Sequence, residues 1–232
     1  MRDARERLIV ALDVSSAAAA KKIVAAVGDS ARFFKVGLQL YTAEGPPIVR
    51  DLVASGRQVF LDLKLHDIPN TVAAAVKEAC KLGVSMLTVH ASGGTNMLRA
   101  AVEAARNTNA SPIILAVTVL TSLDNRDLEH SGVRGNVVDQ VSRLAALAIA
   151  GGCHGVVASA LEAATLRAEL GDDFLIVTPG VRPPGRDHGD QARVVTPAEA
   201  IAAGATYIVV GRPITEANDP AAEAREILAQ IG

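Results

Sequence analysis

Short apolar runs and alanine-rich stretches alternate along this chain, and this alternation limits the possible folds more than any other feature. Eight runs rich in Val, Ile and Leu predict strands, at residues 8–13, 32–37, 58–64, 86–90, 113–118, 155–158, 175–178 and 207–210. Eight other stretches predict helices, at residues 16–27, 47–55, 70–82, 96–107, 137–150, 160–170, 197–203 and 220–231. Because the strand runs are continuously apolar, they are typical of a parallel sheet that is buried on both faces.

Eight strand–helix units in 232 residues predict a closed (β/α)8 barrel, a TIM barrel, that occupies residues 1–232 as a single catalytic domain. Each unit averages 29 residues (232/8), and barrels of this kind have about 250 residues in total. A doubly wound open sheet is the alternative, and it predicts a GxGxxG turn after the first strand. The sequence ALDVSSAAAA at residues 11–20 contains no glycine, which favours the barrel.

The composition disfavours several classes of partner. The formal charge is -2, from 23 Lys and Arg against 25 Asp and Glu, so we expect no basic surface for nucleic acid or for an acidic membrane. The longest apolar runs have about eight residues, far below the roughly 20 that span a bilayer. The two cysteines form no CxxC motif, which suits a reducing compartment. We therefore expect a cytoplasmic protein that binds neither nucleic acid nor membranes.

Charged residues lie at the ends of the first three predicted strands, where barrel enzymes carry their catalytic groups. Asp13 ends the first strand, Lys35 lies on the second, and Asp62 and Lys64 end the third. Residues two apart on a strand point to the same face, so Asp62 and Lys64 are expected side by side. Burying such charges costs several kcal/mol each unless they are paired. An active site is therefore favoured over a purely structural network of ion pairs.

The charged residues also indicate a class of chemistry. A lysine held among carboxylates keeps its charged form, which makes Lys64 a proton donor and not a Schiff-base nucleophile. No cluster of His, Cys and Glu with the spacing of metal ligands lies around it in the sequence. We therefore expect a reaction that generates a carbanion and then protonates it, at a site without a metal.

The stretch DLKLHDIPNT at residues 62–71 resembles the signature of the orotidine 5'-phosphate decarboxylase family. Six further segments resemble the family in the same order, namely ALD at 11–13, FKVG at 34–37, LTS at 120–122, TPGVRP at 178–183, DQ at 190–191 and VVGRPI at 209–214. The resemblance implies decarboxylation of orotidine 5'-monophosphate to uridine 5'-monophosphate and CO2, the last step of de novo pyrimidine synthesis. It also implies that the reaction uses no cofactor.

The resemblance assigns roles to individual residues. Lys64 is expected beside C6 of the pyrimidine as the proton donor, and Asp62 near the substrate carboxylate, where it also holds Lys64. Asp13 and Lys35 are expected at the ribose hydroxyls, with Lys35 completing the charged array. Thr121 and Ser122 are expected to contact the pyrimidine edge, and the alternative is that they only form an ordinary turn. Further substrate contacts are expected after the last two strands, from Pro179, Arg182, Gln191, Gly211 and Arg212.

The phosphate end has a physical rationale of its own. Barrels often bind phosphate with the loops after strands seven and eight. Gly211 allows a backbone N–H to approach closely, and Arg212 offers a bidentate guanidinium. The connection at residues 180–195 is long and rich in Gly, Pro and charge. It is either a surface loop or a lid over the phosphate, and Arg182 and Gln191 favour the lid.

Asp67 lies three residues beyond Lys64, roughly 10 Å along an extended chain, so it has difficulty reaching the mouth of its own barrel. In the family, the equivalent aspartate, with Ile68 and Thr71, reaches into the site of the neighbouring subunit. The resemblance therefore implies a homodimer with shared active sites, in which Asp67 is catalytic together with Lys64, Asp62 and Lys35.

Two other functions remain open. Metal-dependent sugar-phosphate lyases and decarboxylases of the same barrel superfamily share the DxKxxD motif but resemble EVG on the second strand, where the Glu helps hold Mg²⁺. This chain has KVG at residues 35–37, which argues against a metal enzyme. The second alternative is an inactive barrel that binds nucleotides for regulation, and the complete set of Asp13, Lys35, Asp62 and Lys64 argues against it.

Overall fold

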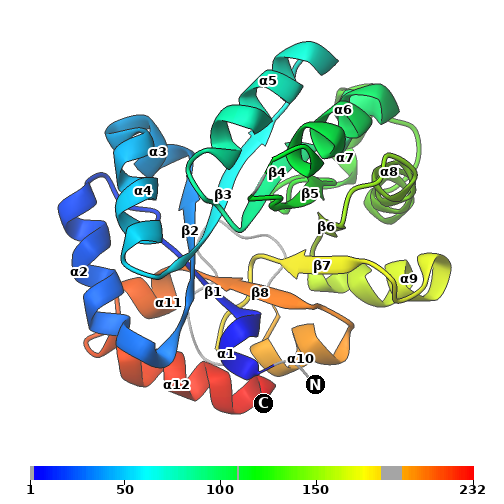
Figure 1. Cartoon of the computed structure of the whole chain (residues 1–232). Coiled ribbons are helices and arrows are strands. Elements are labelled where there is room, and N and C mark those ends of the chain that lie inside the picture. Colours follow the sequence, from blue (N-terminus) through cyan, green and yellow to red (C-terminus); the bar gives the residue numbers. More distant parts are fainter. Residues whose placement is uncertain (1–2, 109, 184–194) are drawn as a thin grey trace.

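The computed structural model describes residues 3–108, 110–183 and 195–232. Eight parallel strands pair in sequence order, and the last pairs with the first to close a barrel (Figure 1). The strands are β1 (Leu8–Ala11), β2 (Phe33–Gly37), β3 (Gln58–Leu65), β4 (Met86–His90), β5 (Ile113–Val117), β6 (Gly155–Val157), β7 (Leu175–Thr178) and β8 (Tyr207–Val210). The predicted (β/α)8 barrel is confirmed.

Helices surround the barrel on its outer side (Figure 1). The predicted helices correspond to α2 (Ala17–Val27), α4 (Pro46–Ala54), α5 (Pro69–Cys80), α6 (Gly94–Arg106), α8 (Val137–Ala150), α9 (Ala160–Leu170), α10 (Pro197–Ala202) and α12 (Pro220–Ile231). The observed ends of all predicted helices and strands lie within two residues of the predicted ones. Proline at the first helical turn marks the starts of α4, α5, α10 and α12, and Ser16 caps α2 by accepting a hydrogen bond from the Ala19 N–H.

The sequence pattern did not reveal several short helices. These are α1 (Ala4–Arg7), α3 (Leu38–Glu44), α7 (Asn125–His130) and α11 (Arg212–Thr215), with the 3-10 helices η1 (Gly28–Ser30) and η2 (Ala91–Gly93). Each of them has seven residues or fewer, which is too short to show a helical period of apolar residues. The start of α7 does carry a local signal, since Asp124 and Asp127 form a capping box.

The core has two parts, because successive residues of each strand face opposite sides of the barrel wall. Leu8 and Val10 of β1 pack outward against the helices, whereas Ile9 and Ala11 point into the barrel. The inward cluster consists of Ile9, Ala11, Phe33, Phe60, Met86, Leu115, Val177, Tyr207 and Val209. These side chains fill the barrel interior, so a functional cavity has room only at an end of the barrel.

Candidate active site

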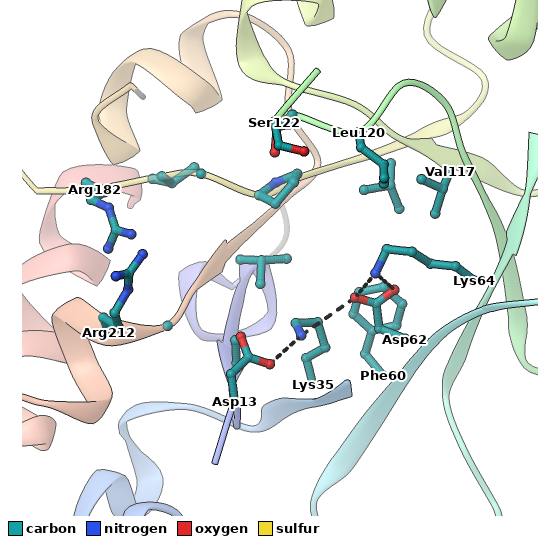
Figure 2. Close-up of a pocket in the computed structure, with 18 of the residues that line it drawn as sticks. Asp13, Lys35, Phe60, Asp62, Lys64, Val117, Leu120, Ser122, Arg182 and Arg212 are labelled. Atoms are coloured by element: carbon teal, nitrogen blue, oxygen red, sulfur yellow. Dashed lines mark hydrogen bonds and ion pairs between the residues drawn. The ribbon is translucent and has the colours of Figure 1, made fainter. Parts of the chain in front are cut away.

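A cavity of about 620 Å³ opens where the strands end (Figure 2). Its apolar surface includes Ala11, Phe60 and Val209, which belong to the inward cluster. The cavity is also lined by ten of the predicted site residues, namely Asp13, Lys35, Asp62, Lys64, Thr121, Ser122, Pro179, Arg182, Gly211 and Arg212. Residues far apart in the sequence therefore meet at the end of the barrel where catalytic groups are usual.

Four of these residues form a continuous line of alternating charge, which we call the charged array (Figure 2). Lys35 Nζ lies 3.0 Å from Asp13 Oδ1 and 3.6 Å from Asp62 Oδ2. Lys64 Nζ lies 2.9 Å from each carboxylate oxygen of Asp62. The array is most buried in its middle, since the side chains of Lys35 and Asp62 are 11% and 12% exposed, against 58% for Asp13 and 30% for Lys64 at its ends.

Asp62 carries its negative charge in spite of its burial. Burial alone raises the pKa of this carboxyl, because it removes water from the charged form. The ammonium groups of Lys35 and Lys64, with hydrogen bonds from Lys64 and Thr88, outweigh that effect and hold the pKa of Asp62 below its usual value. Asp62 is therefore an ionised acceptor for both lysines at neutral pH.

The local sequence of β2 explains the placement of Lys35. Phe34 and Val36 pack outward against the helices, so Lys35 takes the inward face. Gly37 follows at the end of the strand, and a Cβ there would lie 2.9 Å from Lys35 Nζ and 3.1 Å from Asp13 Oδ1. The glycine leaves the space in which Lys35 and Asp13 pair.

Strand β3 is irregular where it carries its catalytic candidates. Leu61 pairs with Leu87 of β4 and Leu65 pairs with Val89, so residues 62–64 stand opposite a single residue of β4. Lys64 has a φ of 51°, in the left-handed region that non-glycine residues rarely adopt. The prediction that Asp62 and Lys64 meet is confirmed, and Leu63 and Leu65 pack outward with Leu61 as strand alternation predicts. The irregularity lies in the pairing of β3 with β4, which is interrupted between Leu61 and Leu65.

The opposite side of the cavity is formed by loops. Arg182 follows β7 and is buried, and Arg212 begins α11 directly after β8 and is exposed. Their guanidinium groups point toward one another (Figure 2). The backbone N–H of Arg182 donates to the carbonyl of Val195 at 2.9 Å, which joins the two described ends of the long β7–α10 connection. Thr121 and Ser122 extend this side beyond β5.

Three predicted site residues lie outside this cavity. Asp67, Ile68 and Thr71 are all exposed, and Ile68 is 67% exposed in spite of its apolar side chain. Asp67 Oδ1 accepts a hydrogen bond from the Ile68 N–H at 2.6 Å, which is a local turn contact. The geometry agrees with the expectation that Asp67 does not serve its own barrel. Gln191 and most of the predicted lid lie outside the described residues.

The structure also brings residues to the site that the sequence pattern missed. Thr88 of β4 is fully buried and its hydroxyl bonds to Asp62. Phe60 and Val117 line the cavity on opposite sides of Lys64 in the view of Figure 2. Glu216, directly after α11, lines it as well. Thr88 is the one polar side chain within the run MLTV at residues 86–89, and that signal could have identified it.

In the described ranges, no group of three or more His, Cys, Asp and Glu side chains has the arrangement of a metal site. Among those same residues, no helix combines the length and apolar character needed to span a membrane.

Known proteins resemble the chain over nearly its full length. The sequence model of the orotidine 5'-phosphate decarboxylase / HUMPS family matches residues 6–227. The chain belongs to this family. The orotidine 5'-phosphate decarboxylase of Moorella thermoacetica is 53% identical over 234 residues, which cover 98% of this chain and 93% of the relative. That of Afipia carboxidovorans is 54% identical, with 98% and 95% covered.

A solved structure of the family has the same fold. The crystal structure of orotidine 5'-phosphate decarboxylase from Lactobacillus acidophilus matches with a TM-score of 0.88 at 39% identity. The match covers 98% of this chain and 99% of that one. The family membership inferred from seven sequence segments is therefore confirmed.

Proposed function

We propose that this member of the family decarboxylates orotidine 5'-monophosphate to uridine 5'-monophosphate and CO2 without a cofactor. Relatives of that name match 98% of the chain at 53% and 54% identity. The observation that carries the proposal is the position of Lys35, whose ammonium lies 3.0 Å from Asp13 and 3.6 Å from Asp62. The two carboxylates are thus already compensated by a cation that belongs to the protein.

The charged array suits a reaction that leaves charge on carbon. When the bond between C6 and the carboxylate breaks, CO2 departs and the electron pair stays on C6 of the pyrimidine. No cofactor ring takes up that pair, so the protein must stabilise it electrostatically. Lys64 Nζ borders the cavity and is the proposed source of both the stabilising charge and the proton. The proton moves from Nζ to C6, and the neutral amine regains a proton from water.

Asp62 is the proposed positioning partner in this step. Both of its oxygens accept from Lys64 Nζ at 2.9 Å, which fixes the direction of the ammonium. An ionised Asp62 also lies close to where the substrate carboxylate is proposed to bind. Asp13, at the exposed end of the array, and the neighbouring Lys35 are the proposed contacts to the ribose hydroxyls.

The loops on the opposite side are the proposed phosphate site. Arg182 and Arg212 present two guanidinium groups to the same space (Figure 2). A phosphate between them accepts charge-assisted hydrogen bonds from both. Gly211 lines the cavity next to Arg212, and Gln191 stays a predicted further contact. Thr121, Ser122 and Pro179 also line the cavity and are the proposed contacts to the rest of the nucleotide.

The family name also covers a second activity, so the alternative needs a physical comparison. A metal-dependent sugar-phosphate lyase requires carboxylates that are free to bind Mg²⁺. Here the Lys35 ammonium lies between Asp13 and Asp62 and repels a divalent cation from that position. The geometry therefore favours the decarboxylase over the metal enzyme.

We also propose that the active enzyme is a homodimer. Asp67, Ile68 and Thr71 form an exposed group at the start of α5, and none of them lines the cavity of its own barrel. In a twofold dimer, the same group on each subunit can complete the site of the other. The cytoplasmic location, and the expectation that neither nucleic acid nor membranes bind, stay predictions from the sequence.

The activity is tested by incubating the purified protein with orotidine 5'-monophosphate, with and without EDTA, and following the orotate absorbance and the released CO2. We expect equal turnover in both samples. Turnover that EDTA abolishes would favour the metal-dependent alternative. Tight nucleotide binding without any release of CO2 would identify the inactive nucleotide-binding barrel.

The shared site is tested by mixing two variants, Lys64→Ala and Asp67→Ala, each of which we expect to be almost inactive alone. A mixed dimer has one site with both changes and one with neither, if Asp67 acts across the interface. Random pairing makes half the dimers mixed, so activity should recover to about a quarter of wild type. If subunits exchange but activity does not recover, Asp67 serves its own barrel.

A further inference from the structure

Strand β4 supplies a polar side chain that reaches the charged array from behind the cavity. Thr88 is fully buried and does not line the cavity. Its hydroxyl lies 3.0 Å from Asp62 Oδ1 and 2.8 Å from the backbone nitrogen of Lys64. One side chain therefore contacts both members of the partly buried Asp62–Lys64 pair.

The direction of these two hydrogen bonds is fixed by the groups involved. A backbone N–H can only donate, so the Thr88 oxygen accepts from Lys64. An ionised carboxylate can only accept, so the single hydroxyl proton of Thr88 goes to Asp62. A hydroxyl is the group that meets both demands at once, and valine of the same shape meets neither.

The position of Thr88 in the sheet explains why these bonds are needed. Thr88 is the only residue of β4 that stands opposite residues 62–64, where the pairing of β3 with β4 is interrupted. The Lys64 N–H therefore bonds to a side chain instead of a strand carbonyl. Lys64 also has a φ of 51°, and such a conformation persists only where its surroundings enforce it.

We propose that Thr88 is a positioning residue that holds the bulge of β3, and with it Asp62 and Lys64, in the arrangement required for proton transfer. This inference rests on the proposed decarboxylase function. Thr88 touches neither the cavity nor the reacting atoms, so it acts through the two residues that it holds.

The test compares Thr88→Val with Thr88→Ser. Valine keeps the branched shape and removes the hydroxyl, so the Lys64 N–H and Asp62 Oδ1 each lose a buried partner. We expect kcat to fall about 10- to 100-fold with KM changed less than about threefold, as for small displacements of catalytic groups. Serine restores the hydroxyl, and we expect its kcat to lie within about threefold of wild type.

Thr118→Val is the matched control. Thr118 is also buried, directly after the neighbouring strand β5, and its hydroxyl donates to the Val157 carbonyl at 2.9 Å. Its hydroxyl bonds to β6 and not to the charged array, and Thr118 does not line the cavity. We expect Thr118→Val to lower the melting temperature without lowering kcat, which separates loss of a buried hydroxyl in general from loss of this one.

Two further readouts distinguish positioning from simple support of the fold. Loss of the Thr88 hydrogen bond raises the pKa of Asp62, so the acid limb of kcat should move to higher pH in Thr88→Val but not in Thr118→Val. Hydrogen exchange at the Lys64 amide, measured without substrate, should become at least about tenfold faster in Thr88→Val.

A failure of the inference about Thr88 can be distinguished from a failure of the proposed function. If wild type does not turn over orotidine 5'-monophosphate, the proposed function fails, while exchange at the Lys64 amide still decides whether Thr88 holds that residue. A Thr88→Val protein with wild-type kcat and unchanged exchange overturns the inference. If valine prevents folding, Thr88→Ala against Thr88→Ser provides the same comparison of hydroxyl absent and present.

Discussion

The two sides of the cavity are built from different parts of the barrel. On one side, strands β2 and β3 and the residue Asp13 just after β1 carry the charged array, with successive ion-pair distances of 3.0, 3.6 and 2.9 Å. On the other side, the segments after β7 and β8 carry Arg182 and Arg212, whose guanidinium groups point toward one another (Figure 2). One side is a chain of opposite charges, and the other brings like charges together.

We expect this difference to separate the residues of the chemical step from those that bind the substrate. Opposite charges in the array hold one another in place, and strands are rigid supports, which suits groups that must be placed within a fraction of an ångström. Like charges that face one another favour an anion between them, which suits a phosphate. The strand side is therefore expected to control kcat, and the loop side to control affinity for the phosphorylated substrate.

The largest expected effect is on the strand side. Lys64→Ala removes the proposed proton donor, so kcat should fall about 10³-fold or more, while the fold and nucleotide binding persist. The measurement is the loss of orotate absorbance, with circular dichroism to confirm folding. Lys21→Ala is the control, because Lys21 forms an exposed ion pair with Asp51 at 2.7 Å and should keep full activity. A folded Lys64→Ala enzyme with near wild-type turnover would refute the assignment.

On the loop side, Arg212→Ala should weaken nucleotide binding and leave nucleoside binding nearly unchanged. Loss of a charge-assisted contact costs about 1.5–3 kcal/mol, which corresponds to roughly 10- to 150-fold in Kd. Calorimetry with uridine 5'-monophosphate and with uridine measures the two affinities. Arg225→Ala on the exposed surface of α12 is the control. Equal losses for nucleotide and nucleoside would show that Arg212 does not contact the phosphate, and Gln191→Ala is tested in the same way.

The pairing of the Asp62 carboxylate with two lysines predicts that the stability of the protein depends on pH. The lysines hold the pKa of Asp62 low, so their stabilisation is present above about pH 4, the ordinary value for aspartate, and is lost as the pH falls through the lower folded value. Urea unfolding of wild type and Asp62→Asn should differ by about 1–3 kcal/mol at pH 7 and converge at low pH. Parallel curves down to pH 2.5 would contradict an ionised, paired Asp62.

The smallest expected effect comes from filling the space beside Lys35 and Asp13. Gly37→Ala places a methyl group 2.9 Å from Lys35 Nζ and 3.1 Å from Asp13 Oδ1, and these flexible side-chain ends can move away. We expect kcat/KM to fall about 3- to 10-fold, since small displacements of positioned groups slow catalysis. The melting temperature should change little. An unchanged kcat/KM in the folded variant would show that the Lys35–Asp13 pair does not depend on this glycine.

Much of the site could be read from the sequence, because it lies at the ends of strands that the apolar runs identify. Asp13, Asp62 and Lys64 end their predicted strands and Lys35 lies two residues before the end of its own, and parallel strands bring such ends to one place. The motif segments added the loop residues, of which Arg182 and Arg212 line the same cavity. Gln191 is the exception, since it lies outside the described residues.

What the sequence by itself determined is the fold class and the set of charged residues at the barrel mouth, since apolar periodicity and strand ends are local properties of the chain. Only the tertiary structure decided how β3 departs from regular pairing and how Thr88 of β4 comes to contact both Asp62 and Lys64. The physical reason is that strand register and hydrogen bonds between strands depend on partners distant in the sequence, which no local pattern of residues specifies.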